Sequence, residues 1–222
     1  MAESQSQNSV IEQLIAKELN IAEGKKIRII YQRGEQIFKQ GAFATHILYV
    51  VNGLIKVYLQ TGYGKQINIS LARSGDFLAF ASTFGENIHS YSALAIKDSE
   101  VCMIERESLK KALLENPEFG LRLTSRNYRI EGLLLEIIRN LSYKQMRGKL
   151  AASLLYLSQE EFAGENVFDF LTRQDIADFA SISVESAIKF LKEFEKEEIV
   201  SLNGKKIYIL DAVKLEQISN AG

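Results

Sequence analysis

The chain has 222 residues, of which 46% are hydrophobic and 25% charged, and its formal net charge is −1. This composition is typical of a soluble globular protein, and the length suffices for one large domain or two small ones. No apolar run approaches the roughly 20 residues that a membrane-spanning helix needs, and the polar N-terminus lacks the pattern of a signal peptide. We therefore expect a cytoplasmic protein with no membrane partner.

Few residues in this chain could bind a metal or form a disulfide. The single cysteine, Cys102, cannot form an intrachain disulfide or supply the four thiolates of a typical iron–sulfur cluster. Two histidines, His46 and His89, leave little material for a histidine-rich metal site. We therefore expect no metal and no cofactor. Because we also find no nucleophile–base pair and no Walker-type phosphate loop, the sequence does not predict an enzyme.

The first half of the chain predicts a short helix followed by many short strands. Residues 8–20 place apolar side chains at helical spacing. Strand-like runs at 47–51, 54–59 and 67–71 are then separated by glycine-containing turns such as Asn52-Gly53. Short strands at this spacing indicate an antiparallel barrel or sandwich.

Residues 117–141 predict a long helix, which would span roughly 36 Å at 1.5 Å per residue. One face follows the a/d spacing of a coiled-coil seam, with the residues Leu123, Asn127, Ile130, Leu134, Ile137 and Leu141. A neighbouring face carries the residues Leu121, Tyr128, Leu135 and Ile138. We favour a seam that meets a second copy while the other face packs on the barrel, over a helix buried within one chain.

The last third of the chain predicts helices and a hairpin. Residues 144–162 favour one helix, and 163–170 a connector with a short strand. Thr172 and Ser183 are then N-cap residues of two short helices. The buried stripe of the second helix is expected to contain Ala187, Ile188, Leu191 and Phe194. Two strand-like runs flank Asn203-Gly204, a strong hairpin signal. This order is that of a winged helix-turn-helix.

The second short helix presents a polar face that suits the DNA major groove. Lys205 and Lys206 in the hairpin suit phosphate contacts. Residues 142–222, however, contain 10 Lys and Arg against 13 Asp and Glu, a net charge of −3. Because winged helices also serve as protein-interaction modules, the pattern alone favours DNA binding without excluding that alternative.

Several segments resemble the cyclic-AMP receptor protein / fumarate-nitrate-reduction regulator (Crp–Fnr) family of bacterial transcription factors. These segments are "RGEQIFKQG", "LYVVNGLIKVY", "SGDFLAF" and, most specifically, "LTRQDIADFASISVESAIKFLKEFEKEEIVSLNGKKIYI". The resemblance covers roughly 8–215. It implies an α+β fold with a cyclic-nucleotide-binding-like β-roll and N-terminal helix at 1–116, a dimerisation helix at 117–141, and a winged helix-turn-helix DNA-binding domain at 142–222.

The resemblance also implies which residues meet DNA. Glu185 resembles a base-reading residue that accepts from a cytosine amino group. Lys189 stands where the family commonly has an arginine, and Val184, in place of a guanine-reading arginine, offers only an apolar contact. Ser181 replaces the usual turn glycine. The full expected DNA-binding set is Thr172, Arg173, Ser183, Val184, Glu185, Ser186, Lys189, Lys192, Lys205 and Lys206.

The expected effector pocket departs from the family pattern. Cyclic-nucleotide binders carry a Gly-Glu pair after the Gly-Asp-Phe turn and then Arg-Ser/Thr-Ala, whereas this chain has Ala79-Phe80 and then Ser90 or Tyr91 before Ser92. Both charged groups are missing, so we do not expect cyclic AMP to bind. The expected pocket residues are Phe80, Ser82, Thr83, Ser90, Tyr91 and Ser92. Haem, with His89 or His46 as ligand, is the less favoured alternative.

The sequence thus predicts a homodimeric regulator that binds a near-palindromic duplex and carries a sensor domain for an unidentified small molecule. The alternative is a ligand-independent regulator or a protein-interaction module with a purely structural β-roll. RNA polymerase is left open as a partner. The sequence identifies neither the effector, nor the target genes, nor the sign of regulation.

Overall fold

The computed structural model describes residues 27–62, 64–85, 87–159 and 166–221. The chain forms two compact units, Met1–Gln60 with Ser70–Ile130 and Thr61–Ile69 with Glu131–Gly222. The helix expected at 8–20 lies outside the described residues. Within the described residues, no helix is long and apolar enough to cross a membrane.

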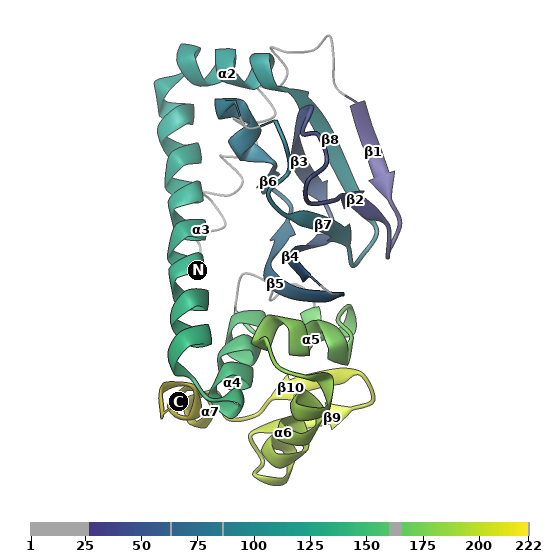
Figure 1. Cartoon of the computed structure of the whole chain (residues 1–222), viewed down its shortest axis with the longest axis vertical. Helices are drawn as coiled ribbons and strands as arrows, with labels where there is room; N and C mark the ends of the chain where they lie inside the picture. The colour runs from purple at the N-terminus through teal and green to yellow at the C-terminus, as the bar shows by residue number, and fades with distance from the viewer. Residues whose placement is uncertain (1–26, 63, 86, 160–165, 222) are drawn as a thin grey trace. The chain divides into compact units, whose positions relative to one another are not determined.

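The strands before residue 106 form two four-stranded sheets (Figure 1). The first sheet has the order β1 (Ile27–Tyr31), β8 (Ser99–Glu105), β3 (His46–Asn52) and β6 (Phe77–Leu78). The second sheet has the order β2 (Gln36–Phe38), β7 (Ser92–Ala95), β4 (Leu54–Gly62) and β5 (Lys65–Arg73). The pairs β1–β8, β3–β8, β3–β6, β2–β7 and β4–β7 are antiparallel, which confirms the strand-rich antiparallel prediction.

The core of the first unit forms where alternate strand residues meet two helices. Ile47 and Tyr49 on β3 and Cys102 and Ile104 on β8 point to one face because side chains alternate along a strand. They pack against α2 (Arg106–Glu115) and the start of α3 (Pro117–Tyr143), which contribute Leu109, Phe119 and Leu123. Cys102 is a buried small apolar side chain, as expected. The sequence patterns did not predict α2.

The exposed side of α3 differs from the expected seam. Leu123 is only 4% exposed and lies in the core of its own unit, so little of its surface is left for a second chain. Among the described side chains, the exposed large apolar or aromatic residues of this helix are Leu121, Leu134, Leu135, Ile138 and Tyr143. Ile137 and Leu141 are half-buried, and the side chains of Asn127 and Ile130 lie outside those described. The neighbouring face, rather than the expected seam, therefore supplies most of the exposed apolar surface.

After α3, the described part of the second unit contains four α-helices, a 3-10 helix and a hairpin. Its elements are α4 (Met146–Leu157), η3 (Val167–Asp169), α5 (Arg173–Ala180), α6 (Val184–Lys196), β9 (Val200–Asn203), β10 (Lys206–Ile209) and α7 (Ala212–Ala221). Helix α4 packs against α5, α6 and α7. The strand expected in the connector at 163–170 is wrong, because the described part of that connector contains the 3-10 helix η3. The sequence patterns also missed α7.

At the position of Gly53, any larger residue would collide with Ser99. Its φ is +112°, and a Cβ built there would lie 2.2 Å from Ser99 Oγ. Ser99 is itself held, because its Oγ accepts from Leu54 N at 3.2 Å and donates to the Lys97 carbonyl at 2.7 Å. The turn between β3 and β4 therefore requires glycine both for its backbone conformation and for space.

We expect Gly53→Ala to lower the free energy of unfolding by about 1–3 kcal/mol more than Gly34→Ala, because only the first change adds a collision to the backbone strain. Gly34 is the matched control, since its φ is +92° and no atom lies within 4 Å of its added Cβ. Denaturant unfolding of both variants measures the difference. Equal losses would show that Ser99 moves aside without cost.

Candidate nucleic-acid interface and ligand pocket

Two N-caps start the pair of helices in the second unit, as predicted. Thr172 Oγ1 accepts from Asp175 N at 3.0 Å, and Asp175 Oδ2 accepts from Thr172 N at 2.8 Å, which completes a capping box at α5. Ser183 Oγ accepts from Ser186 N at 3.2 Å and caps α6. Since both hydroxyls satisfy helix-end N–H groups, Thr172 and Ser183 primarily set where the helices begin.

The turn between α5 and α6 keeps a left-handed residue although it has no glycine. Ser181 has φ 50° and ψ 45° and is the C-cap of α5. Its N–H donates to the Asp178 carbonyl at 3.3 Å, and the next N–H, of Ile182, donates to the Ala177 carbonyl at 3.1 Å. The side-chain oxygen of Ser181 is buried without a hydrogen-bond partner. Ser181 therefore has the left-handed backbone conformation that is usual for glycine, and this conformation is strained for serine.

Helix α6 is amphipathic, and its apolar stripe fixes which face is outward. Ala187, Leu191 and Phe194 are buried. Ile188, which was expected in this stripe, is 39% exposed, so that expectation is wrong. The residue falls beyond the edge of the buried face because the stripe follows the steps 187, 191 and 194. The exposed residues of α6 from the expected DNA-binding set are Glu185, Lys189 and Lys192, while Val184 and Ser186 are half-buried.

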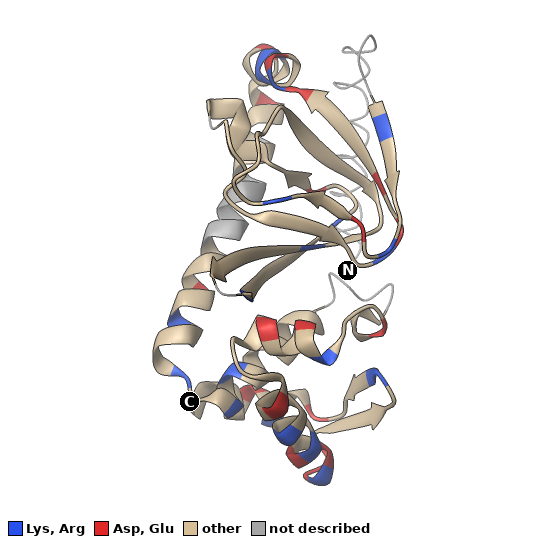
Figure 2. Ribbon diagram, turned by 45° about the vertical axis from the view of Figure 1, so that its right-hand side comes forward, with Lys and Arg blue, Asp and Glu red and all other residues tan. Residues whose placement is uncertain are grey.

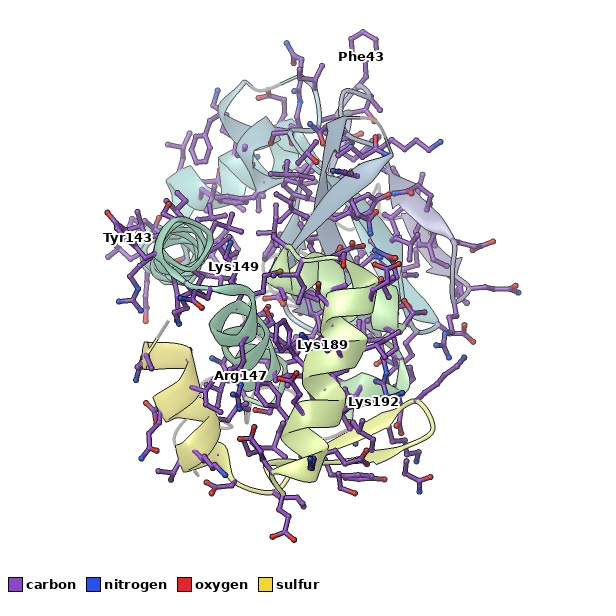
Figure 3. All side chains as sticks on the ribbon, turned by 60° about the horizontal axis from the view of Figure 1, so that its bottom comes forward. Phe43, Tyr143, Arg147, Lys149, Lys189 and Lys192 are labelled. Carbon is purple, nitrogen blue, oxygen red and sulfur yellow. The ribbon has the colours of Figure 1, made fainter. Side chains whose placement is uncertain are left out.

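Figure 3 labels Lys189 and Lys192 on α6 and Arg147 on the neighbouring α4. The ribbon in Figure 2 shows acidic residues interspersed with basic ones along α6, and basic residues on the β9–β10 hairpin as well. Lys189 Nζ lies 4.0 Å from Glu193 Oε1, and Lys206 Nζ lies 3.4 Å from Asp169 Oδ2. The surface is thus mixed in charge, and two of its lysines are already paired with carboxylates.

Glu185 is the acidic group at the N-terminus of α6. Its own backbone N–H and the Ser183 hydroxyl hydrogen-bond the carboxylate, and these bonds lower the pKa of Glu185 below its usual value. The carboxylate is therefore ionised at neutral pH and can only accept hydrogen bonds. An exposed acceptor at the start of a helix has the hydrogen-bonding character that a cytosine amino donor in the major groove would require.

Arg173 is half-buried, and its guanidinium is hydrogen-bonded to the β9–β10 hairpin. Its Nη1 donates to the Lys205 carbonyl at 3.1 Å and its Nη2 to the Gly204 carbonyl at 3.0 Å. Burial lowers the pKa of Arg173, although a guanidinium stays protonated. Arg173, a member of the expected DNA-binding set, thus fixes the hairpin turn against α5. Lys205 and Lys206 are exposed on that hairpin.

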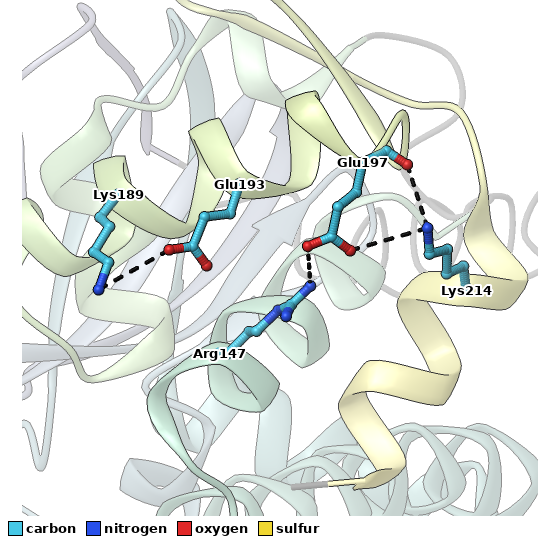
Figure 4. Close-up of polar contacts among 5 residues, drawn as sticks. All are labelled: Arg147, Lys189, Glu193, Glu197 and Lys214. Atoms are coloured by element: carbon cyan, nitrogen blue, oxygen red, sulfur yellow. Dashed lines mark hydrogen bonds and ion pairs between the residues drawn. The ribbon is translucent and has the colours of Figure 1, made fainter.

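An ion-pair cluster at the C-terminal end of α6 was missed by sequence reasoning. Arg147 Nη2 on α4 lies 2.6 Å from Glu197 Oε1, and Lys214 Nζ on α7 lies 3.9 Å from Glu197 Oε2 (Figure 4). The Arg147 guanidinium also lies over the Phe194 ring, 5.3 Å from its centroid. These contacts link α4, α6 and α7. The residues lie far apart in the sequence, so no local pattern predicts their contact.

The first unit contains a small hollow near η1 (Phe80–Phe84). It is lined by Ala44, Ala79, Ala81, Ser82, Ile88, His89, Ser90 and Tyr91. The structure thus brings together three expected pocket residues, Ser82, Ser90 and Tyr91. The expected residues Phe80, Thr83 and Ser92 do not line the hollow. The volume of the hollow is about 210 Å³, including the part of it that is open to solvent.

Aromatic side chains fill the interior beside this hollow. Phe38 and His89 stack with ring centroids 3.9 Å apart, and Phe38 lies 5.5 Å from Tyr91. Burial lowers the pKa of His89 and raises that of Tyr91, whose hydrogen bond from Ala79 N opposes the rise. At neutral pH both side chains are therefore uncharged. His46 lies on β3, where its Nδ1 is 3.0 Å from Thr45 Oγ1, and does not line the hollow.

Comparison with known proteins assigns both halves of the chain. Residues 28–116 match the cyclic nucleotide-binding domain, and residues 148–218 match the Crp-like helix-turn-helix domain. The fumarate and nitrate reduction regulatory protein of Vibrio cholerae is 30% identical over 195 residues, covering 85% of this chain and 76% of that protein. The chain belongs to the Crp–Fnr family of transcription regulators.

Two further relatives agree with this assignment. The cAMP-activated global transcriptional regulator CRP of Salmonella typhimurium is 26% identical over 183 residues, which cover 81% of this chain and 87% of that protein. The structure of FixK2 from Bradyrhizobium japonicum has a TM-score of 0.75 and 20% identity, covering 87% of this chain and 97% of that one. The predicted α+β fold, with a β-roll and a helix-turn-helix, is confirmed.

The hollow does not fit the cyclic nucleotide that the domain type implies. Arg106 lies close by, but its Nη1 donates to Asn87 Oδ1 at 2.9 Å and to the Ser82 carbonyl at 3.5 Å. Among the described residues, neither an arginine nor a carboxylate lines the hollow, so these residues would give a buried phosphate no counter-charge. The volume is also below the roughly 300–1,000 Å³ of typical small-molecule sites, which argues equally against haem.

We expect Ser181→Gly to raise the free energy of unfolding by about 1 kcal/mol relative to Ser181→Ala. Both changes remove the buried, unpartnered hydroxyl, but only glycine relieves the left-handed strain. Urea unfolding followed by far-ultraviolet circular dichroism compares the two variants. Equal stabilities would mean that the turn stores no backbone strain.

Proposed function

We propose that this Crp–Fnr protein is a homodimer that binds a near-palindromic duplex through α6 and does not require cyclic AMP. The observation that carries the proposal is the exposed, ionised Glu185 at the capped start of α6, on a helix whose opposite face is buried. A side chain held there reads a base edge because the helix behind it is fixed.

Support for a dimer comes from α3. Its exposed residues Leu121, Leu135 and Ile138 are 71%, 63% and 58% exposed. The first two are 14 positions apart, or two heptads, and Ile138 follows three positions later, as in a coiled-coil stripe. A second copy would bury this stripe and give the pair of recognition helices that two half-sites roughly 34 Å apart require.

The mixed charge of the second unit favours one further candidate, a protein-interaction module. Residues 142–222 have a net charge of −3, and Lys189 and Lys206 already lie near carboxylates. DNA binding by this surface would therefore depend on few phosphate contacts. Affinity for duplex DNA should fall only gently as salt is raised, because the slope is set by the number of phosphates neutralised.

Selection of bound duplexes from a random library by the purified protein, with no ligand added, tests the proposal. Enrichment of a near-palindrome is the expected result. If nothing is enriched, the same selection in cell extract tells a missing effector from a surface that does not read DNA. Failure in both would favour the protein-interaction module.

We expect Glu185→Ala and Lys192→Ala to affect DNA binding in different ways. Loss of the Glu185 carboxylate should remove about 1–3 kcal/mol of discrimination at one base pair of each half-site. Loss of Lys192, exposed on α6, should weaken binding to all duplexes and reduce the salt slope by about 0.9 for each phosphate that is no longer neutralised. Fluorescence anisotropy against matched and single-mismatch duplexes at several salt concentrations measures both effects.

The controls change the same charges away from α6, with Glu216→Ala on α7 and Lys110→Ala on α2, both exposed. Neither should alter discrimination or the salt slope. A Glu185→Ala protein that kept its full base preference would contradict the assignment of that carboxylate.

We expect Leu135→Glu to weaken self-association by roughly 100-fold or more, because it removes apolar burial and places two like charges in the seam. Sedimentation velocity over a range of protein concentrations measures the dissociation constant. The matched control is Leu114→Glu, since Leu114 is 75% exposed but lies on α2. If both variants dissociate alike, or the unmodified protein is a monomer, the α3 seam is wrong.

A further inference from the structure

One side chain that lines the hollow of the first unit, Tyr91, is hydrogen-bonded to the backbone at the start of η1. The Tyr91 phenol oxygen accepts a hydrogen bond from Ala79 N at 2.8 Å. Ala79 has a left-handed backbone with φ 57° and is the N-cap of η1, so this N–H marks where the helix begins. An acceptor on Tyr91 therefore fixes the start of η1, and a buried N–H left without one would be costly.

The same hydrogen bond joins the two segments that cyclic-nucleotide binders of the family use to hold their ligand. Ala79 stands at the glycine of the Gly-Glu pair, and Tyr91, directly before Ser92, stands at the arginine of the Arg-Ser/Thr-Ala segment. In a nucleotide binder the ligand would link these segments. Here a side chain of the protein links them, with the ring of Tyr91 placed against Phe38.

We propose that Tyr91 is an internal substitute for an effector, holding η1 and the segment before β7 together without any bound small molecule. Two observations support this beyond the hydrogen bond. The remaining space is about 210 Å³ including open solvent, which is below the usual size of a ligand site. Ser92, next in the chain, is fully buried, and its Oγ accepts from Gln40 N at 2.9 Å, which anchors the segment on its other side.

This role of Tyr91 would make DNA binding independent of an effector, an inference that rests on the proposed function. A sensor domain held in one arrangement by its own tyrosine has no ligand-dependent population to shift. DNA affinity of the full-length dimer should then be the same with and without cyclic AMP. The role of Tyr91 itself does not depend on DNA binding.

The test removes the Tyr91 side chain from the full-length protein and adds back its phenol group as a free molecule. Tyr91→Ala should open a cavity of the size of a phenol ring and lower the melting temperature by roughly 10 °C. Added 4-methylphenol, which is the tyrosine side chain as a free molecule, should restore much of that loss by binding the folded state. Toluene, which fills the ring space but has no oxygen, should restore less. Tyr143→Ala, at a tyrosine that is 84% exposed, is the matched control and should show neither loss nor rescue.

Two further measurements apply even if Tyr91→Ala does not fold. Tyr91→Phe keeps the ring but removes the acceptor for Ala79 N, so its melting temperature should fall by a few degrees without rescue by 4-methylphenol. The unmodified protein should show no thermal shift with cyclic AMP or cyclic GMP in large excess.

Stabilisation of the unmodified protein by either nucleotide would overturn the proposal, as would equal rescue by toluene and 4-methylphenol, or a Tyr91→Phe protein as stable as the unmodified one. Thermal rescue together with no DNA enrichment would leave the role of Tyr91 standing and remove the proposed function. Enrichment that appears only with a cyclic nucleotide would keep DNA binding and remove the internal substitute.

Discussion

Hydrogen bonds to the first N–H groups of α5 and α6 are the constraint on which the second unit depends. Thr172 and Ser183, 11 residues apart, supply them and so leave room for one short helix and one tight turn. With both helix starts fixed, burial of Ala187, Leu191 and Phe194 leaves only one face of α6 exposed. The outward direction of Glu185 follows from the caps and the stripe together, since neither alone determines it.

Ion pairs within the second unit engage acidic and basic side chains with one another. Glu197 lies near both Arg147 and Lys214, so one carboxylate of the acidic excess serves to join α4, α6 and α7. Such partly exposed pairs contribute modestly to stability, about 0–1 kcal/mol each. Each pair neutralises one acidic and one basic group, so it changes which charges face solvent without changing the net charge. Net charge is therefore a poor guide to this surface.

Local patterns predicted the elements that local rules control. The caps at Thr172 and Ser183, the Asn203-Gly204 hairpin and the strands after residue 27 were confirmed because each depends on residues close in sequence. The burial of Leu123 and the exposure of Leu135 could not be predicted, since two apolar faces of one helix compete and only tertiary packing selects between them. Helices α2 and α7 were missed for a similar reason, because each buries too few apolar residues to leave a clear period.

The sequence and the structure explain different features of the hollow near η1. The sequence shows that the two charges expected by the family pattern are absent, but it leaves Ser90 and Tyr91 as equal candidates for the arginine position. The structure decides between them, because only Tyr91 places an oxygen on the Ala79 N–H. Arg106, the guanidinium that donates to the Ser82 carbonyl, is also bound to Asn87 and does not line the hollow. A phosphate there would therefore have to displace an internal hydrogen bond, and the described lining residues would give it no counter-charge, so both costs disfavour a bound phosphate.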